Sequence, residues 1–95
     1  VTYIDIDGNK LSSLDLSNNK ELTTIDVDNN ELQALDVSML PKLEYLYAES
    51  NALRKIDVTK NPALIRLYVS GNAGITSMDM SNNPNLKELG VPFSF

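Results

Sequence analysis

Four aspartates recur at a regular spacing, and their carboxylates are the side chains in this sequence best suited to chemistry. They are Asp15, Asp36, Asp57 and Asp79, and each is followed two residues later by a Ser or Thr. A carboxylate pair held in a cleft could hydrolyse a glycosidic bond, and a row of hard oxygen ligands could bind Ca²⁺. A third role is structural, because Asp and Ser/Thr side chains tie down turns through local hydrogen bonds.

The repetition of this pattern favours the structural role. A feature present in every repeat serves every repeat, and no single pair of acids stands out from the row as a catalytic pair. The known calcium-binding solenoid motif is rich in glycine, whereas this chain has only four glycines. We therefore expect the row to hold turns, with calcium-stabilised adhesion as a distant alternative.

The composition narrows the remaining functions. The chain has 95 residues, with 13 acidic and 8 scattered basic residues for a net charge of −5, which argues against a nucleic-acid partner. It contains no Cys and no His, so the usual zinc ligands and the Cys–His and Ser–His nucleophile pairs are excluded. No apolar run approaches the roughly 20 residues that span a bilayer. We expect no enzyme activity, no cofactor and no membrane insertion.

The elements that position these residues follow from an internal repeat. The repeats cover 1–21, 22–42, 43–63 and 64–85, the last with one residue inserted near Gly74, and a partial repeat covers 86–95 of one predicted domain. Each contains two apolar–polar–apolar triplets, the period of a half-buried strand, and turn-forming residues follow soon after. This predicts a mainly β solenoid of about 4.5 coils, with two short parallel strands per coil and little or no helix.

Asparagines recur at two positions of the repeat. The first set is Asn9, Asn30, Asn51 and Asn72, and the second is Asn19, Asn61 and Asn83, with Leu40 at the equivalent place in one coil. An amide at a core position is costly unless it is hydrogen-bonded. We expect each of these amides to satisfy backbone groups in a turn.

The complete pattern, L-x-x-L-x-L-x-x-N-x-L-x-x-L-D-L-x-x-N, resembles the bacterial leucine-rich repeats with a nested unit of 21 residues. The segment LSSLDLSNNKELTTIDVDNNELQALDVS matches this pattern closely. The pattern covers the whole chain except its last four residues. The resemblance implies a right-handed solenoid and a secreted or cell-surface protein of a bacterium that binds other macromolecules. The chain departs from the pattern at Leu40-Pro41, near Gly74 and at its final residues.

The two predicted strands of each coil differ in their outward positions. The second strand presents the constant Asp and Ser/Thr, whereas the first varies from coil to coil. We predict a partner-binding patch on the first strand, with acidic residues beside it, made of Tyr45, Tyr47, Arg66, Tyr68, Asp26, Asp28 and Glu49. Tyr and Arg are enriched at binding hot spots, and tyrosine suits both protein and carbohydrate surfaces.

Two interpretations of the chain remain open. The first is a protein- or glycan-recognition module that binds through this patch. The second is a structural spacer without a ligand, in which strand propensity alone explains the tyrosines. At the incomplete last coil, Phe93 and Phe95 could fold back as a cap, or the coil could pair end to end with a second copy.

Overall fold

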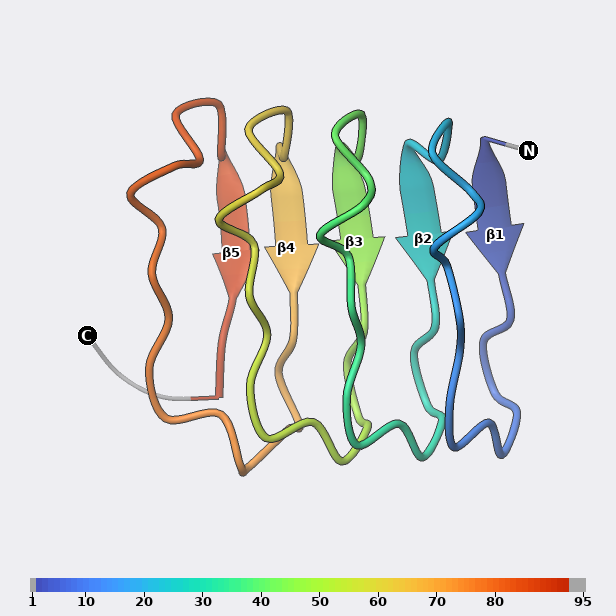
Figure 1. Cartoon of the computed structure of the whole chain (residues 1–95). Helices are drawn as coiled ribbons and strands as arrows, with labels where there is room; N and C mark the ends of the chain where they lie inside the picture. The colour runs from blue at the N-terminus through green and yellow to red at the C-terminus, as the bar shows by residue number, and fades with distance from the viewer. Residues whose placement is uncertain (1, 93–95) are drawn as a thin grey trace.

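The backbone winds into successive coils, each of which adds one short strand to a single parallel sheet (Figure 1). The computed structural model describes residues 2–92, so the expected cap formed by Phe93 and Phe95 lies outside the described residues. The strands are β1 (Tyr3–Asp5), β2 (Thr24–Asp26), β3 (Tyr45–Tyr47), β4 (Arg66–Tyr68) and β5 (Glu88–Gly90). Each pairs in parallel with the next, in sequence order. The predicted mainly β solenoid is confirmed.

The register of the sheet reproduces the sequence repeat. Partner residues in neighbouring strands lie 21 positions apart, as for Tyr3 and Thr24, and 22 apart between β4 and β5, as for Arg66 and Glu88. Because equivalent residues become neighbours, each position of the repeat forms a column along the solenoid. The described residues include no helix that is long and apolar enough to cross a membrane.

The prediction of a second strand in each coil is wrong. The segments around Asp15, Asp36, Asp57 and Asp79 form no ladder between coils within the described range. The aspartates themselves provide the physical reason. Asp36 Oδ1 accepts hydrogen bonds from the backbone N–H of Ser38 at 2.9 Å and from its hydroxyl at 2.6 Å, and the other aspartates bond their Ser or Thr in the same way. The N–H of each of these Ser or Thr residues is thus used within its own coil, and no backbone hydrogen bond joins residues 33–39 to residues 54–60.

The apolar side chains of every coil point inward and form continuous columns. In the central coils these side chains are buried almost completely, as for Ile25, Leu46 and Leu67 at 0% exposure. At the two ends the equivalent residues Ile4 and Leu89 are only partly buried, because each has a neighbouring coil on one side only. A coil therefore gains the roughly 1.5–3 kcal/mol of a fully buried side chain only when it is covered on both sides.

The first asparagine set connects each coil to the one before it. Asn51 donates to the carbonyl of Ala48 in its own coil at 3.3 Å and to that of Val27 in the previous coil at 3.0 Å. Its carbonyl oxygen accepts the N–H of Leu32 in the previous coil at 3.1 Å. Asn30 and Asn72 repeat these contacts. The predicted role of this set in satisfying backbone groups is confirmed.

The second asparagine set is less completely bonded. Asn61 donates to the carbonyls of Val37 and Leu40 in the previous coil at 2.9 and 3.0 Å. The buried side-chain oxygens of Asn61 and Asn83, by contrast, accept no hydrogen bond from residues 2–92. Leu40 fills the equivalent position in its coil with 0% exposure. The fold therefore depends less on an amide at this position than at the first.

The residue before each asparagine of the first set has a left-handed backbone. These residues are Gly8, Asn29, Ser50 and Gly71, with φ between 57° and 77°. Glycine adopts this conformation without the penalty that a Cβ brings. A Cβ on Gly71 would also lie 3.0 Å from the backbone nitrogen of Ser50, whereas one on Gly8 would meet nothing within 4 Å.

The residue inserted in the fourth coil is absorbed by a tight turn. The N–H of Ile75 donates to the carbonyl of Asn72 at 3.0 Å, so the chain closes before the apolar column resumes at Ile75. Gly74 passes close to the third coil, where a Cβ would lie 3.0 Å from Arg54 Cα. Glycine is needed at this point because the two backbones are nearly in contact.

We predict that the two asparagine positions differ in their contribution to stability. Asn51→Ala should lower the free energy of unfolding by about 1–3 kcal/mol, because it removes the amide's bonds to Val27 and Ala48 and leaves the N–H of Leu32 without its acceptor. Asn61→Leu should cost less, since the change also removes an unpaired buried oxygen and Leu40 already occupies this position in another coil. Urea unfolding followed by circular dichroism measures both, and equal losses would contradict the ranking.

The left-handed position gives a second prediction with an internal control. Gly8→Ala should destabilise the chain by about 1 kcal/mol, the cost of a Cβ in a left-handed conformation. Gly71→Ala should cost clearly more, since its Cβ would press on the backbone of Ser50. Thermal melts of the two variants measure the loss of stability. Gly8→Ala reports the backbone strain alone, and Gly71→Ala reports the strain together with the contact on Ser50. A larger loss for Gly8→Ala would refute this explanation.

Candidate functional site

The outward face of the sheet carries side chains in regular columns. One column contains Tyr3, Thr24, Tyr45, Arg66 and Glu88, and the next, two residues further along each strand, contains Asp5, Asp26, Tyr47, Tyr68 and Gly90. Neighbouring strands lie about 4.8 Å apart, so side chains within a column are in reach of each other. The face therefore consists of two parts, an aromatic part on the later strands and an acidic part on the earlier ones.

The aromatic part is a contiguous cluster, as the sequence predicted. The rings of Tyr47 and Tyr68 stack with their centroids 5.5 Å apart and an angle of 16° between their planes. The guanidinium carbon of Arg66 lies 5.5 Å from the ring centroid of Tyr45, a distance at which a cation is attracted to the face of a ring. These four residues and Glu88 form the group that we call the aromatic cluster.

Glu88 holds the aromatic cluster together, although the sequence analysis did not select it. Its carboxylate accepts a hydrogen bond from Arg66 Nε at 2.8 Å and another from the hydroxyl of Tyr68. The bond from Tyr68 is the main cause that lowers the pKa of Glu88, and the same bond raises the pKa of the Tyr68 hydroxyl. The column arrangement placed Glu88 beside Arg66, but its bond to Tyr68 crosses between columns and has no signal in the sequence.

Gly90 leaves room for the stacked rings. A Cβ at this position would lie 2.9 Å from Cδ1 of Tyr68, closer than ordinary contact allows. The ring of Tyr68 thus lies against the backbone of β5, with Tyr47 on its other side. The aromatic stack fills its column from the third coil to the fifth.

The acidic part lies on the first three coils. It contains Asp5, Asp7, Asp26, Asp28 and Glu49, which we call the acidic group. The predicted residues Asp26 and Asp28 are half-buried, and Asp26 is the strand partner of Tyr47. Asp28 Oδ1 accepts the backbone N–H of Glu49 at 2.7 Å, which links two coils. The structure therefore places Asp26 beside Tyr47, as the sequence predicted, and links Asp28 to Glu49 across two coils.

Burial and repulsion by neighbouring carboxylates destabilise the charges of Asp26 and Asp28. The pKa of Asp26 and the pKa of Asp28 are both raised, first because burial disfavours the charged form and then because other carboxylates of the group lie nearby. Among the described residues, the carboxylates that pair with a basic side chain are Glu21 with Lys42 and Glu88 with Arg66. The acidic group thus has no cation of its own within residues 2–92.

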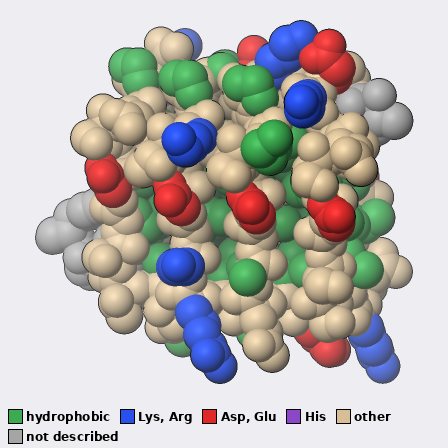
Figure 2. Space-filling model, in the orientation of Figure 1, with side chains coloured by type: hydrophobic (Ala, Val, Ile, Leu, Met, Phe, Trp, Pro, Cys, Tyr) green, Lys and Arg blue, Asp and Glu red, His purple; other side chains and the backbone are tan. Residues whose placement is uncertain are grey.

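The opposite side of the solenoid carries the aspartate row. Figure 2 shows acidic side chains evenly spaced across this side, over the segments that connect the strands. Hydrogen bonds from Ser or Thr lower the pKa of Asp15, Asp36, Asp57 and Asp79. No group of three or more acidic side chains in the described part of the chain is arranged to hold a metal ion. The row acts on its own turns, which is the structural role expected from the sequence.

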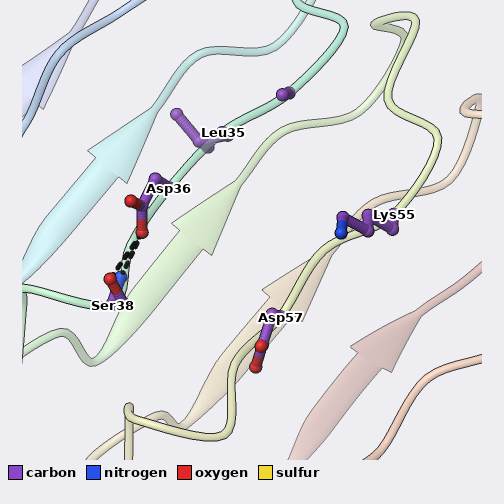
Figure 3. Close-up of a pocket in the computed structure, with 6 residues that line it drawn as sticks. Leu35, Asp36, Ser38, Lys55 and Asp57 are labelled. Atoms are coloured by element: carbon purple, nitrogen blue, oxygen red, sulfur yellow. Dashed lines mark hydrogen bonds between the residues drawn. The ribbon is translucent and has the colours of Figure 1, made fainter.

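A shallow pocket lies between two coils on this side (Figure 3). Its volume is about 340 Å³, and it is lined by Ala34, Leu35, Asp36, Ser38, Lys55 and Asp57. Asp36 is already bonded to Ser38 within its own turn, as the dashed lines show. The pocket thus lies away from the variable face, and part of its polar lining serves the turn.

Comparison with known proteins supports a repeat protein. No family model matches the chain, and no curated protein matches it. Among solved structures it is similar to the functional domain of InlJ from Listeria monocytogenes, described as including a cysteine ladder, with a TM-score of 0.79 and 30% sequence identity. The alignment covers 100% of this chain but 26% of the InlJ chain. A cysteine ladder is a property of InlJ, since this chain has no cysteine.

The raised pKa of Asp26 predicts a gain in stability when its charge is removed. A raised pKa in the folded state means that the folded form is favoured below the pKa of the unfolded chain and loses this advantage as pH rises through the folded pKa. Asp26→Asn should therefore stabilise the chain at pH 7 by about 0.2–1 kcal/mol, the cost of like charges on paired strand positions. The amide oxygen that this substitution introduces can still accept the backbone N–H of Asp28.

Thermal melts at pH 7 and at about pH 3, below the reference pKa of an aspartate, test this sign. The stabilisation should appear at the higher pH and vanish at the lower one. Glu31→Gln, which removes an exposed carboxylate outside the strands, is the control for net charge. A gain of equal size from both variants would mean that the position of Asp26 is irrelevant.

Proposed function

We propose that this chain, which has the fold of a leucine-rich-repeat solenoid, is a recognition module that binds a macromolecule through the outward face of its sheet. The observation that carries the proposal is the contrast between its two sides. The aspartate row repeats one structural contact in every coil, whereas the sheet face keeps the same backbone and changes its side chains. A fixed frame with variable side chains is the arrangement on which repeat proteins build binding surfaces.

The aromatic cluster is the best candidate for the centre of this surface. Tyr and Arg contribute most to binding at protein interfaces because they combine a large contact area with hydrogen-bonding groups. Here Tyr45, Tyr47, Tyr68 and Arg66 are already held in place by stacking and by Glu88. Little conformational entropy would be lost on binding, because these side chains are ordered before a partner arrives.

The resemblance to bacterial repeats extends the proposal to the protein's location. We propose that the module belongs to a secreted or surface-exposed bacterial protein, where it would contact proteins or glycans. The similarity to the InlJ domain supports an interaction module in general terms. The face is built on five strands of three residues each, so it would supply one modest site.

A structural spacer is the second candidate, and one observation favours it. The members of the aromatic cluster interact with one another across coils through ring stacking, a cation–π contact and a salt bridge. They therefore stabilise the sheet without any ligand. Stacked and paired aromatic residues contribute about 0.5–1.5 kcal/mol in this way. The spacer predicts that changes in the cluster alter stability and leave binding untouched.

A double variant separates the two functions. The chain is screened on an array of extracellular-matrix proteins, mucins and glycans, and each interaction found is then measured with Tyr47→Ala/Tyr68→Ala. We expect a loss of about 2 kcal/mol in binding free energy, roughly thirtyfold in Kd, as for a hot spot. The matched control is Met39→Ala/Lys60→Ala, which removes exposed side chains away from the strands.

The measurement is made at a temperature at which circular dichroism shows both double variants folded. If the tyrosine variant keeps full affinity, or if no array member binds the wild-type chain, the spacer replaces the recognition module.

A further inference from the structure

The aromatic cluster contains a cation site that the chain fills by itself. Tyr45, Arg66 and Glu88 follow one another in a single column of the sheet. The guanidinium of Arg66 lies over the ring of Tyr45 and donates from Nε to the carboxylate of Glu88. The ring and the carboxylate together stabilise one positive charge, through the ring face and through a charge-assisted hydrogen bond.

The neighbouring column repeats the ring and the carboxylate, but within residues 2–92 its carboxylates form no salt bridge. Tyr47 stacks on Tyr68 through one face of its ring, and the strand on its other side presents Asp26. Asp5 follows in the same column, and Asp28 lies two residues from Asp26 along the chain. Among the described residues, Arg66 pairs with Glu88 and lies over Tyr45, and it forms no salt bridge with these carboxylates.

We propose that the outward surface formed by Tyr47 and Asp26 binds a Lys or Arg side chain from a basic segment of a partner protein. This inference rests on the proposed function of the sheet face and adds the chemistry of the partner. A cation at this point would lie against the face of Tyr47 turned away from Tyr68, beside carboxylates that form no salt bridge within the described residues. Further basic residues of the same segment would lie over Asp5, Asp7 and Asp28.

Charge decides between a basic protein segment and a neutral glycan. A neutral sugar could stack on Tyr47, but it would leave a group of like charges without compensation. The pKa values of Asp26 and Asp28 are raised by burial and by their acidic neighbours, and a bound cation would reverse the second of these effects. Complementary charge also steers the encounter between partners. The face is therefore matched to a partner of opposite charge.

The experiment uses a peptide of defined charge as the probe. A fluorescein-labelled hexapeptide with the sequence GKRKRG is titrated into the whole chain, with fluorescence anisotropy and amide chemical shifts as readouts. The control peptide carries acetyl-lysine and citrulline in place of Lys and Arg, which keeps its shape and removes its charge. Cellohexaose tests a neutral glycan in parallel.

We expect the basic peptide to bind and to shift amides of β1, β2 and β3, while the neutral peptide does not bind. Raising NaCl from about 50 mM to about 500 mM should weaken the interaction, because salt screens exposed charges. Asp5→Asn/Asp26→Asn and Tyr47→Leu should each raise Kd by about tenfold, as expected for loss of complementary charge or of a ring that faces a cation. Glu31→Gln, with its carboxylate outside the strands, should change Kd by less than about twofold.

Three results would overturn the inference: no binding of the basic peptide, equal binding of the neutral peptide, or amide shifts confined to the aspartate row. If cellohexaose binds instead and its binding is lost in Tyr47→Ala/Tyr68→Ala, the recognition face stands and its partner is a neutral glycan. The proposed function itself fails if the Tyr47→Ala/Tyr68→Ala variant keeps full affinity for the array partners, or if no array member binds the wild-type chain.

Discussion

One amide contact between coils fixes the geometry on which the rest of the structure depends. An asparagine at the end of each strand segment donates to carbonyls of its own coil and of the previous coil, and it accepts an N–H from the previous coil, as Asn51 and Asn72 show. Because these hydrogen bonds join equivalent positions of neighbouring coils, the chain turns at the same place in each of them. The strands then align with a constant register, and equivalent side chains meet in columns.

Because of this alignment, the inward and outward side chains of a coil meet different requirements. Inward side chains have to match those of the neighbouring coils, since a coil buries its apolar surface only against them. Outward side chains on the strands carry no such requirement. On the connecting side, the aspartates bond the N–H groups of their own turns, which leaves that side extended but without a ladder. Only the sheet face therefore combines a rigid backbone with freedom of sequence.

The distribution of charge on the sheet face follows from how each carboxylate is compensated. Glu88 has Arg66 and Tyr68 as partners, and its pKa is lowered. Asp26 and Asp28 are half-buried among other acids, and their pKa values are raised. The chain thus keeps a group of destabilised charges next to an ordered aromatic cluster, at some cost to its own stability. A binding role gives that arrangement a physical purpose, because a partner of opposite charge would remove the cost.

The sequence alone determined the parts of the structure that depend on the repeat. A period of 21 residues makes equivalent positions neighbours. The spacing in the sequence therefore predicts the apolar columns, the bonded asparagines and the grouping of Tyr45, Tyr47, Arg66 and Tyr68. The tertiary structure alone decided the features that depend on competition between individual hydrogen bonds. The alternating pattern around Asp36 suggested a strand, but the aspartate captured the N–H group of Ser38 within its own turn. Glu88 joined the aromatic cluster through a bond to Tyr68 that crosses columns, and burial set the pKa of Asp26. A repeat specifies which residues are neighbours, whereas side-chain geometry and solvent exclusion specify which neighbours bond and which charges are left without a partner.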